Sequence, residues 1–486
     1  MKTNINILSG FLYKFLERVG VQGSGFVISL LLARILTPNE YGIVALVLVI
    51  ITVLEVFVTF GFGNSLVVDN QSSQLDFSTC FYFSIILSLI IYLFIYLLAP
   101  LLSDWLSYDT KTAIYKYDIN LLNCVIRVMA IKIPISAINS IQVAFIQKNL
   151  LFSKSLYASL LGTLISGIFA IILAYKGFGV WALVFQNLIN TFLNTLILFF
   201  LLKWFPSLMF SFKRLKKIYD YGWKILCVGL IDVWYSQLRS FVIAKKYSAT
   251  DLAYYNKGHQ FPSTGMDLIE STINGVLFPL LSKCNDNKTE MEKITSSIIN
   301  LSTYITFPLM IGLYIVSDSL VLILLTEKWI EASIYIKIGC LAFLLRPLQS
   351  INACVIRASG KSGMLLYLNI IKKSVGIILL IISIPYGVPA IAFSFVIVNI
   401  IATIINILPI KTLIGYGFKD QFRDFIINAL PSAIMGFFLI LISYIDVSLM
   451  AKFIIQIMSG IIIYITASFL MKNKSFYYIL KLLKNH

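Results

Sequence analysis

Apolar runs long enough to cross a lipid bilayer recur along this chain, and short polar breaks separate them. A transmembrane helix needs about 20 consecutive apolar residues, so the sequence predicts about fourteen such helices. The polar connections are too short for a folded domain outside the membrane, and we predict an all-α integral membrane protein. The predicted spans lie near residues 11–36, 41–67, 78–102, 120–146, 153–175, 178–202, 219–244, 252–281, 294–324, 332–357, 363–384, 387–410, 425–445 and 450–471.

The composition excludes the soluble classes of protein. Hydrophobic residues make up 59% of the chain and charged residues 13%, against about 45–50% and 25% in soluble domains. The net charge of +17 would suit nucleic-acid binding only on a soluble basic domain, so we expect no nucleic-acid partner. Instead, Lys and Arg gather at alternate helix ends by more than two to one, as cytoplasmic loops do. Both chain termini are therefore predicted to be cytoplasmic.

Three groups of residues recur in order at nearly one spacing, which indicates an internal repeat. The repeat unit holds six predicted helices, an even number, so both copies cross the membrane in the same direction. We predict two parallel six-helix bundles followed by two additional helices. The matches place Ala33, Arg34, Thr37 and Glu40 with Ala244, Lys245, Ser248 and Asp251; Pro134, Ile138, Asn139 and Lys148 with Pro347, Ile351, Asn352 and Lys361; and Phe178, Gly179, Val180 and Ala182 with Tyr386, Gly387, Val388 and Ala390.

This repeat sets the predicted domain bounds. The first bundle spans residues 1–205, a basic cytoplasmic linker 206–218, the second bundle 219–411, and the two additional helices 424–472. The linker region, Lys203–Asp220, is both basic and aromatic. One interpretation is a helix that lies on the membrane surface and is attracted to anionic lipid headgroups. The other is a linker whose positive charge serves only the topology.

Several charged residues fall well inside the predicted spans. Each would cost about 2.5–3.5 kcal/mol if it faced lipid, so we expect them to face one another or a water-filled cavity. Basic members outnumber acidic ones, which favours an anionic cargo, and the guanidinium fork of Arg matches phosphate geometry. The candidate residues of a cationic binding cavity are Arg127, Arg239, Arg346, Arg18 and Lys373.

These candidates have other interpretations. Each basic residue could form a structural pair within the membrane or extend toward an interface. Arg346 directly precedes Pro347, where a broken helix would expose backbone groups to a cavity. A second set of titratable groups is a candidate for ion or proton coupling, although a structural role is open for each. This set comprises His259, Asp267, Glu270, Asp232 and Glu55.

The sequence holds little that would build a catalytic or metal centre. It has two histidines, one of them the terminal His486, and its six cysteines show no paired spacing typical of zinc ligands. We therefore expect no metal site, no cofactor and no catalytic residues, and the chain is predicted not to be an enzyme.

The first hundred residues carry a family likeness. Phe15–Leu46, FLERVGVQGSGFVISLLLARILTPNEYGIVAL, is followed by FVTFGFGNSLV and CFYFSIILSLIIYLFIYLLAPLL. These segments resemble the polysaccharide transporter family, the Wzx-type flippases of lipopolysaccharide or exopolysaccharide repeat units, and within it the colanic-acid type. The family belongs to the superfamily of multidrug, oligosaccharidyl-lipid and polysaccharide exporters.

The resemblance implies a fold, a cargo and a location. The fold would be a V-shaped, MATE-like pair of bundles that works by alternating access. The cargo would be an undecaprenyl-diphosphate-linked oligosaccharide, moved from the cytoplasmic to the outer leaflet of the bacterial inner membrane. Membrane lipids and polysaccharide polymerase machinery are the other partners implied. The family has no invariant catalytic motif, so the residues proposed above depend on burial and charge.

Two other functions remain open at this point. A cation-coupled drug antiporter of the same superfamily would need a dominant acidic site, which the excess of basic residues in the spans opposes. An integral-membrane glycan polymerase or ligase would need catalytic residues on a sizeable outer loop, and the predicted outer loops are short.

Overall fold

A computed structural model shows the fold and describes residues 2–59, 61–69, 72–108, 117–284 and 287–484. All regular elements in these ranges are helices. Thirteen helical segments in these ranges, some of them made of two consecutive helices, are long and apolar enough to cross a membrane, which confirms the prediction of an all-helical, multi-pass membrane protein. The chain divides into two compact units, Met1–Ala253 and Tyr254–His486, here named unit 1 and unit 2.

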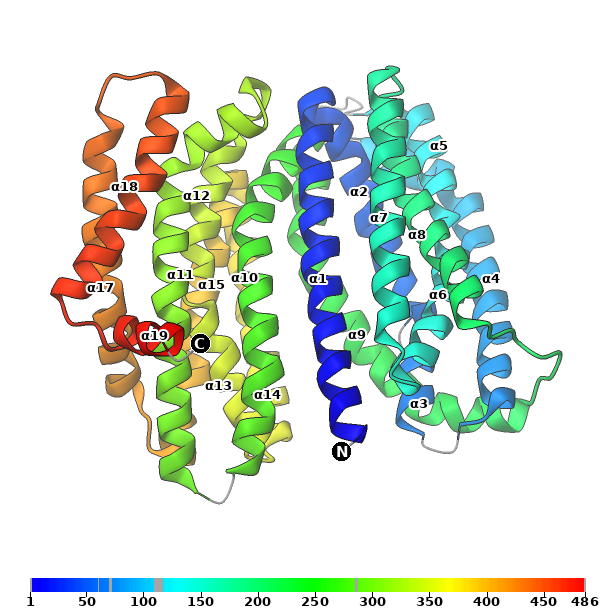
Figure 1. Ribbon diagram of the computed structural model, residues 1–486. Coiled ribbons are helices and arrows are strands. Elements are labelled where there is room, and N and C mark those ends of the chain that lie inside the picture. Colours follow the sequence, from blue (N-terminus) through cyan, green and yellow to red (C-terminus); the bar gives the residue numbers. More distant parts are fainter. Residues whose placement is uncertain (1, 60, 70–71, 109–116, 285–286, 485–486) are drawn as a thin grey trace. The chain divides into compact units, whose positions relative to one another are not determined.

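Unit 1 is a bundle of long antiparallel helices (Figure 1). In this unit, α1 and α8 both pack against α7, α4 packs against α5 and α6, and α9 packs against α2. Its helices are α1 (Lys2–Ile35), α2 (Pro38–Thr59), α3 (Phe62–Val68), α4 (Gln74–Ser107), α5 (Ile119–Ala130), α6 (Lys132–Lys148), α7 (Phe152–Tyr175), α8 (Val180–Leu202) and α9 (Phe212–Lys246).

Unit 2 begins within α10 (Ala249–Lys283) and packs its helices around α11 and α15. The further elements are α11 (Lys288–Leu324), η1 (Glu327–Trp329), α12 (Ala332–Phe343), α13 (Arg346–Ala358), α14 (Ser362–Ser383), η2 (Ile384–Tyr386), α15 (Val388–Ile407), α16 (Ile410–Ile414), α17 (Phe418–Ser443), α18 (Leu449–Leu470) and α19 (Lys474–Lys484).

Helix α10 corresponds to the predicted span 252–281, but it is not among the thirteen apolar helices. Lys257, His259, Asp267 and Glu270 all lie on it and lower its hydropathy. A helix this polar needs partners inside the protein, because charged groups facing lipid are costly.

Two predicted spans, 120–146 and 332–357, are each broken into two helices. Helix α5 ends at Ala130 and α12 ends at Phe343, four residues before Pro134 and Pro347 respectively. A proline ring clashes with the carbonyl of the residue four positions earlier and supplies no N–H group. The prolines of the repeat therefore break the same span in each unit, and the break predicted beside Arg346 is present.

The other repeated residues also have structural roles. Thr37 and Glu40 exchange hydrogen bonds at the start of α2, with the Thr37 N–H donating to Glu40 at 2.7 Å. At the start of α10, the Asp251 N–H donates to the Ser248 hydroxyl, and that hydroxyl donates to the Asp251 carboxylate. Such a capping box satisfies N–H groups at the start of a helix that have no partner within the helix.

Glycines of the repeat begin α8 and α15. Gly179 has a φ of 54° and Gly387 a φ of 96°, a region of backbone conformation that side chains disfavour. The recurrence of glycine in the third match therefore reflects a tight turn before the last helix of each repeat.

The linker region does not separate the two units. Residues 203–211 form an extended segment and α9 starts at Phe212, but α9 packs against α2, α3 and α4 of unit 1. At one contact, the backbone of Gly222 lies so close to Gly61 that a Cβ on Gly61 would come within 2.8 Å of the Gly222 carbonyl oxygen. The contact-based division at Ala253 therefore lies after α9, and the bounds inferred from the repeat, with a linker at 206–218, stay a prediction.

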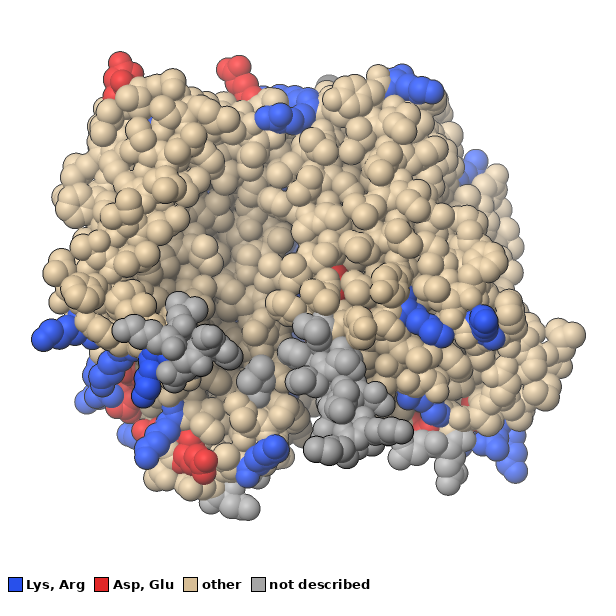
Figure 2. Space-filling view, in the orientation of Figure 1, with Lys and Arg blue, Asp and Glu red and all other residues tan. Residues whose placement is uncertain are grey.

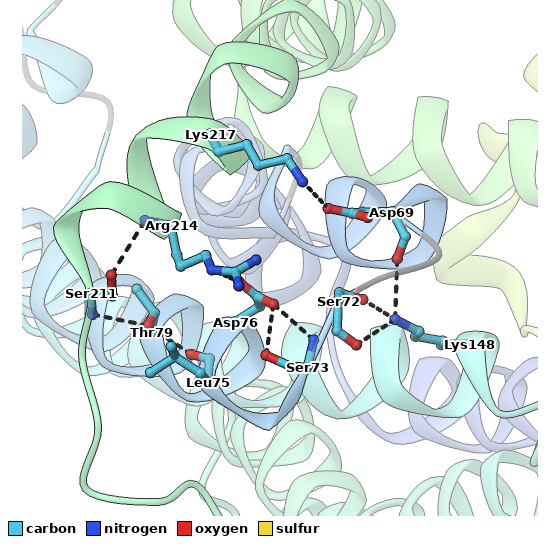
Figure 3. A network of polar contacts seen from close by, with 10 residues as sticks. All are labelled: Asp69, Ser72, Ser73, Leu75, Asp76, Thr79, Lys148, Ser211, Arg214 and Lys217. Atoms are coloured by element: carbon cyan, nitrogen blue, oxygen red, sulfur yellow. Dashed lines mark hydrogen bonds and ion pairs between the residues drawn. The ribbon is translucent and has the colours of Figure 1, made fainter.

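Ion pairs fix the start of α9 against the end of α3 and the first turn of α4 (Figure 3). The Lys217 ammonium lies 2.9 Å from an Asp69 oxygen, and the Arg214 guanidinium 3.8 Å from Asp76. Lys148, at the end of α6, donates to the carbonyls of Ser72 and Asp69. The basic residues of the linker are therefore partly engaged by acidic partners.

The two additional helices predicted at the C-terminal end of the chain are α17 and α18, which pack against α11. Tyr464 of α18 donates to the main-chain carbonyl of Tyr304 at 2.6 Å, and Met435 and Leu439 of α17 complete this apolar cluster. Helix α19 follows the last predicted span and runs across the direction of α17 and α18 (Figure 1).

On the face of each unit that Figure 2 shows, charged side chains lie mostly toward the upper and lower ends, and the surface between them is largely uncharged. Many large apolar side chains are exposed on this surface, for example Leu97, Phe200 and Leu470. An apolar band that remains exposed in the folded chain is what a bilayer requires.

Candidate functional site

The break between α5 and α6 places a charged pair inside unit 1. Lys132 begins α6, and its ammonium lies 3.1 Å from one carboxylate oxygen of Glu55 on α2. Ser136 donates to the other oxygen at 2.6 Å. The two charged side chains are only 18% and 13% exposed. Either charge without its partner would be strongly unfavourable at this depth.

A polar cavity of about 610 Å³ lies beside this pair. Its wall comes from α2, α6 and α8, with Gly63 of α3 and Val233 of α9 at its margin. Glu55 and Lys132 neutralise one another, so this pair gives the cavity no net charge. The polar residues of the wall are Thr52, Glu55, Thr59, Lys132, Ser136, Asn139, Ser140, Gln147, Asn190, Thr191 and Asn194.

The carboxamides of this wall come from two helices and contact one another. Asn139 of α6 donates to Asn194 of α8 at 3.3 Å, and Asn194 donates to Ser159 of α7. Asn190, one turn before Asn194, donates to Thr163 of α7. These bonds hold the amide groups in place at one side of the cavity.

The corresponding break in unit 2 also carries a charged group. Arg346 begins α13 and lies 2.8 Å from Glu270 and 3.3 Å from Asp267, both on α10. The guanidinium carbon lies 4.9 Å from the ring centre of Phe343, the last residue of α12. The Arg346 side chain is 30% exposed and Glu270 17%. This Arg346 cluster joins three of the residues that the sequence proposed.

His259 is connected to the same cluster through an aromatic side chain. Its ring lies 5.0 Å from that of Phe343, and it also contacts Tyr255 and Phe395. Phe343 thus contacts both His259 and Arg346. The proposed coupling group His259 lies close to the Arg346 cluster, separated from it by a phenyl ring.

Polar side chains beyond the break of unit 2 bind one another. Gln349 donates to both the main-chain and the side-chain oxygen of Asn399 on α15, at 3.0 and 3.1 Å. Asn406 donates to the Gln349 main-chain carbonyl, and Lys372 of α14 donates to Asn406 at 3.0 Å. Asn352 is fully buried and pairs with Gln421 of α17.

The remaining proposed residues lie elsewhere. The Arg127 guanidinium covers the ring of Tyr96 on α4 at 4.4 Å and donates to the Tyr96 carbonyl. Arg239 is buried in α9 near Tyr235, whereas Asp232 of the same helix is exposed. Arg18 is exposed on α1, and Lys373 is half-buried on α14. Among the described residues, the wall of the unit 1 cavity includes none of these.

Sequence reasoning missed the partner of Glu55 and the carboxamide wall. The available signal was the repeat itself, because Lys132 and Arg346 both stand within two residues of its proline. The same comparison places Asp267 212 residues after Glu55, close to the repeat spacing. In the part of the chain that the structure describes, no group of His, Cys, Asp and Glu has the arrangement of a metal site.

Comparison with known families decides the membership of this chain. The family model described as "Polysaccharide biosynthesis protein" matches residues 31–334, which is more than half of the sequence. The chain belongs to this polysaccharide biosynthesis protein family. The resemblance found in the sequence is thereby confirmed.

Curated relatives of this chain have similar names. It is 22% identical over 320 residues to the succinoglycan biosynthesis transport protein ExoT of Rhizobium meliloti, covering 66% of this chain and 63% of that protein. It is 21% identical over 421 residues to the lipopolysaccharide biosynthesis protein WzxC of Escherichia coli, covering 85% of this chain and 82% of WzxC. The match therefore spans less than two thirds of ExoT but most of WzxC.

Solved structures share the fold. The lipid II flippase MurJ in an inward closed conformation superimposes with a TM-score of 0.75 at 17% identity, over 95% of this chain and 98% of MurJ. A multidrug resistance MATE family transporter in an inward-facing conformation gives 0.57 at 16% identity, over 84% of this chain. These likenesses confirm the predicted fold class, an all-helical membrane protein with a MATE-like fold.

Proposed function

We propose that this protein is a flippase for undecaprenyl-diphosphate-linked oligosaccharide repeat units. It moves them from the cytoplasmic to the outer leaflet by alternating access, for the synthesis of lipopolysaccharide, capsule or exopolysaccharide. Family membership, the names of ExoT and WzxC and the MurJ-like fold support this proposal. The same relatives are transport or biosynthesis proteins of polysaccharides, which supports a transporter over an enzyme.

The structural observation that carries the proposal is the Arg346 cluster. A guanidinium fork inside the spans, held by Glu270 and Asp267, is a group that can exchange its carboxylates for a diphosphate. Uptake of a proton by one carboxylate would weaken its hold on Arg346 and favour that exchange. Transport and proton movement would then be coupled at one place in unit 2.

The other proposed residues have supporting roles in this account. Arg127, Arg239, Arg18 and Lys373 are further candidate contacts for the diphosphate or anionic sugars. His259, Asp232 and Glu55 are candidate coupling groups, and the contact between His259 and Phe343 favours His259 among them. The proposal keeps the bounds inferred from the sequence: two bundles at 1–205 and 219–411, a linker at 206–218 and two additional helices at 424–472.

The proposed location is the bacterial inner membrane, with both termini in the cytoplasm. The extended segment and the first residues of α9 support a membrane-surface position for the linker region, because Leu208 and Phe212 are 95% and 79% exposed near the basic Lys213. Membrane lipids and the polysaccharide polymerase machinery are the proposed partners. No cofactor, metal or nucleic acid enters this account.

The test is complementation of a deletion strain, with surface polysaccharide as the readout. Deletion abolishes the polymer and the unchanged gene restores it. Arg346→Ala lowers the restored polymer about ten-fold, the equivalent of about 1.4 kcal/mol of lost cargo binding. Arg346→Lys, which keeps the charge but loses the fork, gives an intermediate level. Arg357→Ala, at the exposed far end of α13, is the matched control and restores the polymer fully.

Protein abundance in the membrane is measured for every variant, so that lost expression is not mistaken for lost transport. Normal surface polymer in the deletion strain, together with altered dye efflux, would contradict the flippase assignment and favour the drug antiporter. Full activity of Arg346→Ala at normal abundance would leave the flippase assignment standing but remove Arg346 from the binding site.

A further inference from the structure

We infer that the unit 1 cavity is a binding subsite for an uncharged sugar ring of the cargo. The inference rests on the proposed function and names the part of the cargo that this cavity recognises. Its volume of about 610 Å³ falls in the range of about 300–1,000 Å³ that is usual for small-molecule sites.

The wall has the hydrogen-bonding chemistry that a sugar needs. Sugar hydroxyl groups both donate and accept hydrogen bonds, and a carboxamide also offers both functions. Each carboxamide has two N–H donors and an oxygen that accepts twice. The bonds of Asn139 and Asn190 within the described structure use one donor each. The rest of their capacity is available to a ligand in the cavity.

The charges of the wall oppose an ionic ligand. Lys132 and Glu55 form a pair at 3.1 Å, and Ser136 binds the second carboxylate oxygen. An anion or an organic cation would have to separate Lys132 from Glu55, whose side chains are 18% and 13% exposed. This separation costs more than at the Arg346 cluster, where Arg346 and Asp267 are 30% and 36% exposed. A polar ligand without charge enters without breaking this pair, so the site favours hydroxyl groups over phosphate.

A polar cavity within a membrane span also needs an occupant. Polar groups that are removed from water without a hydrogen-bond partner cost free energy, so water fills the cavity when no ligand is bound. Hydroxyl groups can replace these waters while keeping the same hydrogen bonds. A sugar ring can therefore enter at little cost in lost hydrogen bonding.

Comparison with unit 2 shows that the fold does not require this polar wall to be open. Gln349 stands where the repeat spacing places Ser136, and its longer side chain reaches Asn399. Asn352 stands at the repeat position of Asn139, and its side-chain amide donates a hydrogen bond to the carboxamide oxygen of Gln421. The same broken span is thus compatible with polar groups at these two positions that bind other side chains.

The experiment uses the full chain in lipid nanodiscs free of glycolipid. Two probes are compared by saturation-transfer NMR: the repeat-unit oligosaccharide released from the surface polymer of the host, and inorganic diphosphate. Asn190→Ala removes a carboxamide from the wall, and Asn194→Ala removes a second. Asn187→Ala is the matched control, since Asn187 lies on the same helix, is not among the described residues that line the cavity, and donates to the Leu183 carbonyl.

We expect the oligosaccharide to bind the unchanged protein and the Asn187→Ala control equally. Asn190→Ala and Asn194→Ala should each weaken this binding about ten-fold, because a hydroxyl group loses its partner. Diphosphate binding should be unchanged in both. Equal oligosaccharide binding by all variants would overturn the inference, as would loss of diphosphate binding in Asn190→Ala.

The outcome is separable from that of the proposed function. If deletion of the gene removes surface polymer while Asn190→Ala binds the oligosaccharide normally, the flippase assignment stands and the cavity assignment is wrong. If deletion leaves the polymer intact but the cavity binds the oligosaccharide through Asn190, the chain has a sugar site and the flippase assignment is wrong.

Discussion

In unit 1 the residues that follow the broken span face a cavity, whereas in unit 2 the corresponding residues bind one another. Both breaks are caused by a proline four residues beyond the end of a helix, and both place a basic residue at the start of the next helix. Lys132 has one carboxylate partner and Arg346 has two. The two copies of the repeat therefore share the helix break and the basic residue beside it, but the partners of the neighbouring side chains differ.

The difference has a local cause in unit 2. Helix α17, which lies outside the repeat, supplies Gln421 to the buried Asn352, and Gln349 is longer than Ser136. The comparison teaches that one broken span can serve two purposes. In our account, unit 2 holds an exchangeable guanidinium and unit 1 holds a neutral, hydroxyl-binding cavity.

The largest effect on stability is expected from separating the pair in unit 1. Lys132→Met leaves the Glu55 carboxylate largely buried without its cation, which should destabilise the protein by about 3 kcal/mol. Glu55→Gln with Lys132→Met should destabilise less than Lys132→Met alone, because no charge is then left behind. The measurement is the thermal unfolding of the purified variants in nanodiscs.

A double-mutant cycle gives the coupling between the two residues. The account requires the two substitutions to be strongly non-additive. If the effects of Lys132→Met and Glu55→Gln simply add, the two charges do not stabilise one another. The cavity would then not owe its neutral character to this pair.

A smaller effect is expected from making unit 2 resemble unit 1. Gln349→Ser removes two hydrogen bonds to Asn399 and should cost about 1–2 kcal/mol. The Arg346 cluster should remain intact, so transport at normal abundance should be retained. A Gln349→Ser variant as stable as the unchanged protein would mean that the Gln349–Asn399 contact does not help to close unit 2.

Much of the fold could be predicted from the sequence, because a membrane span requires a long run of apolar residues that can be recognised without knowing the structure. Long apolar runs predict spanning helices, and Pro134 and Pro347 mark the breaks by a local steric rule. The recurrence of Gly179 and Gly387 has an equally local cause, the left-handed turn before α8 and α15. Features of this kind need no knowledge of which helices are neighbours.

The candidate site was harder to predict because it depends on helix neighbours. Asp267, Glu270 and Arg346 were each proposed, yet their association joins α10 to α13 and has no local signal. Lys132 and Glu55 lie 77 residues apart in sequence. Arg127 was easy to single out in the sequence because a charged residue inside a span is rare. In the structure its guanidinium lies over the ring of Tyr96 on α4 and is not part of the wall of the unit 1 cavity. Helix α9 is a further example, since its sequence shows that it is a helix but not that it packs against α2.

The most direct test of the central claim is a flipping assay in proteoliposomes that contain the purified protein and the host's own undecaprenyl-diphosphate-linked repeat unit. The sugar is oxidised from outside by membrane-impermeant periodate, and the oxidised fraction is followed with time. The account predicts that the accessible fraction rises from about half to nearly all of the lipid-linked sugar, and that Arg346→Ala slows this rise about ten-fold. An accessible fraction that stays at the level of protein-free liposomes, with the protein folded and correctly incorporated, would contradict the account.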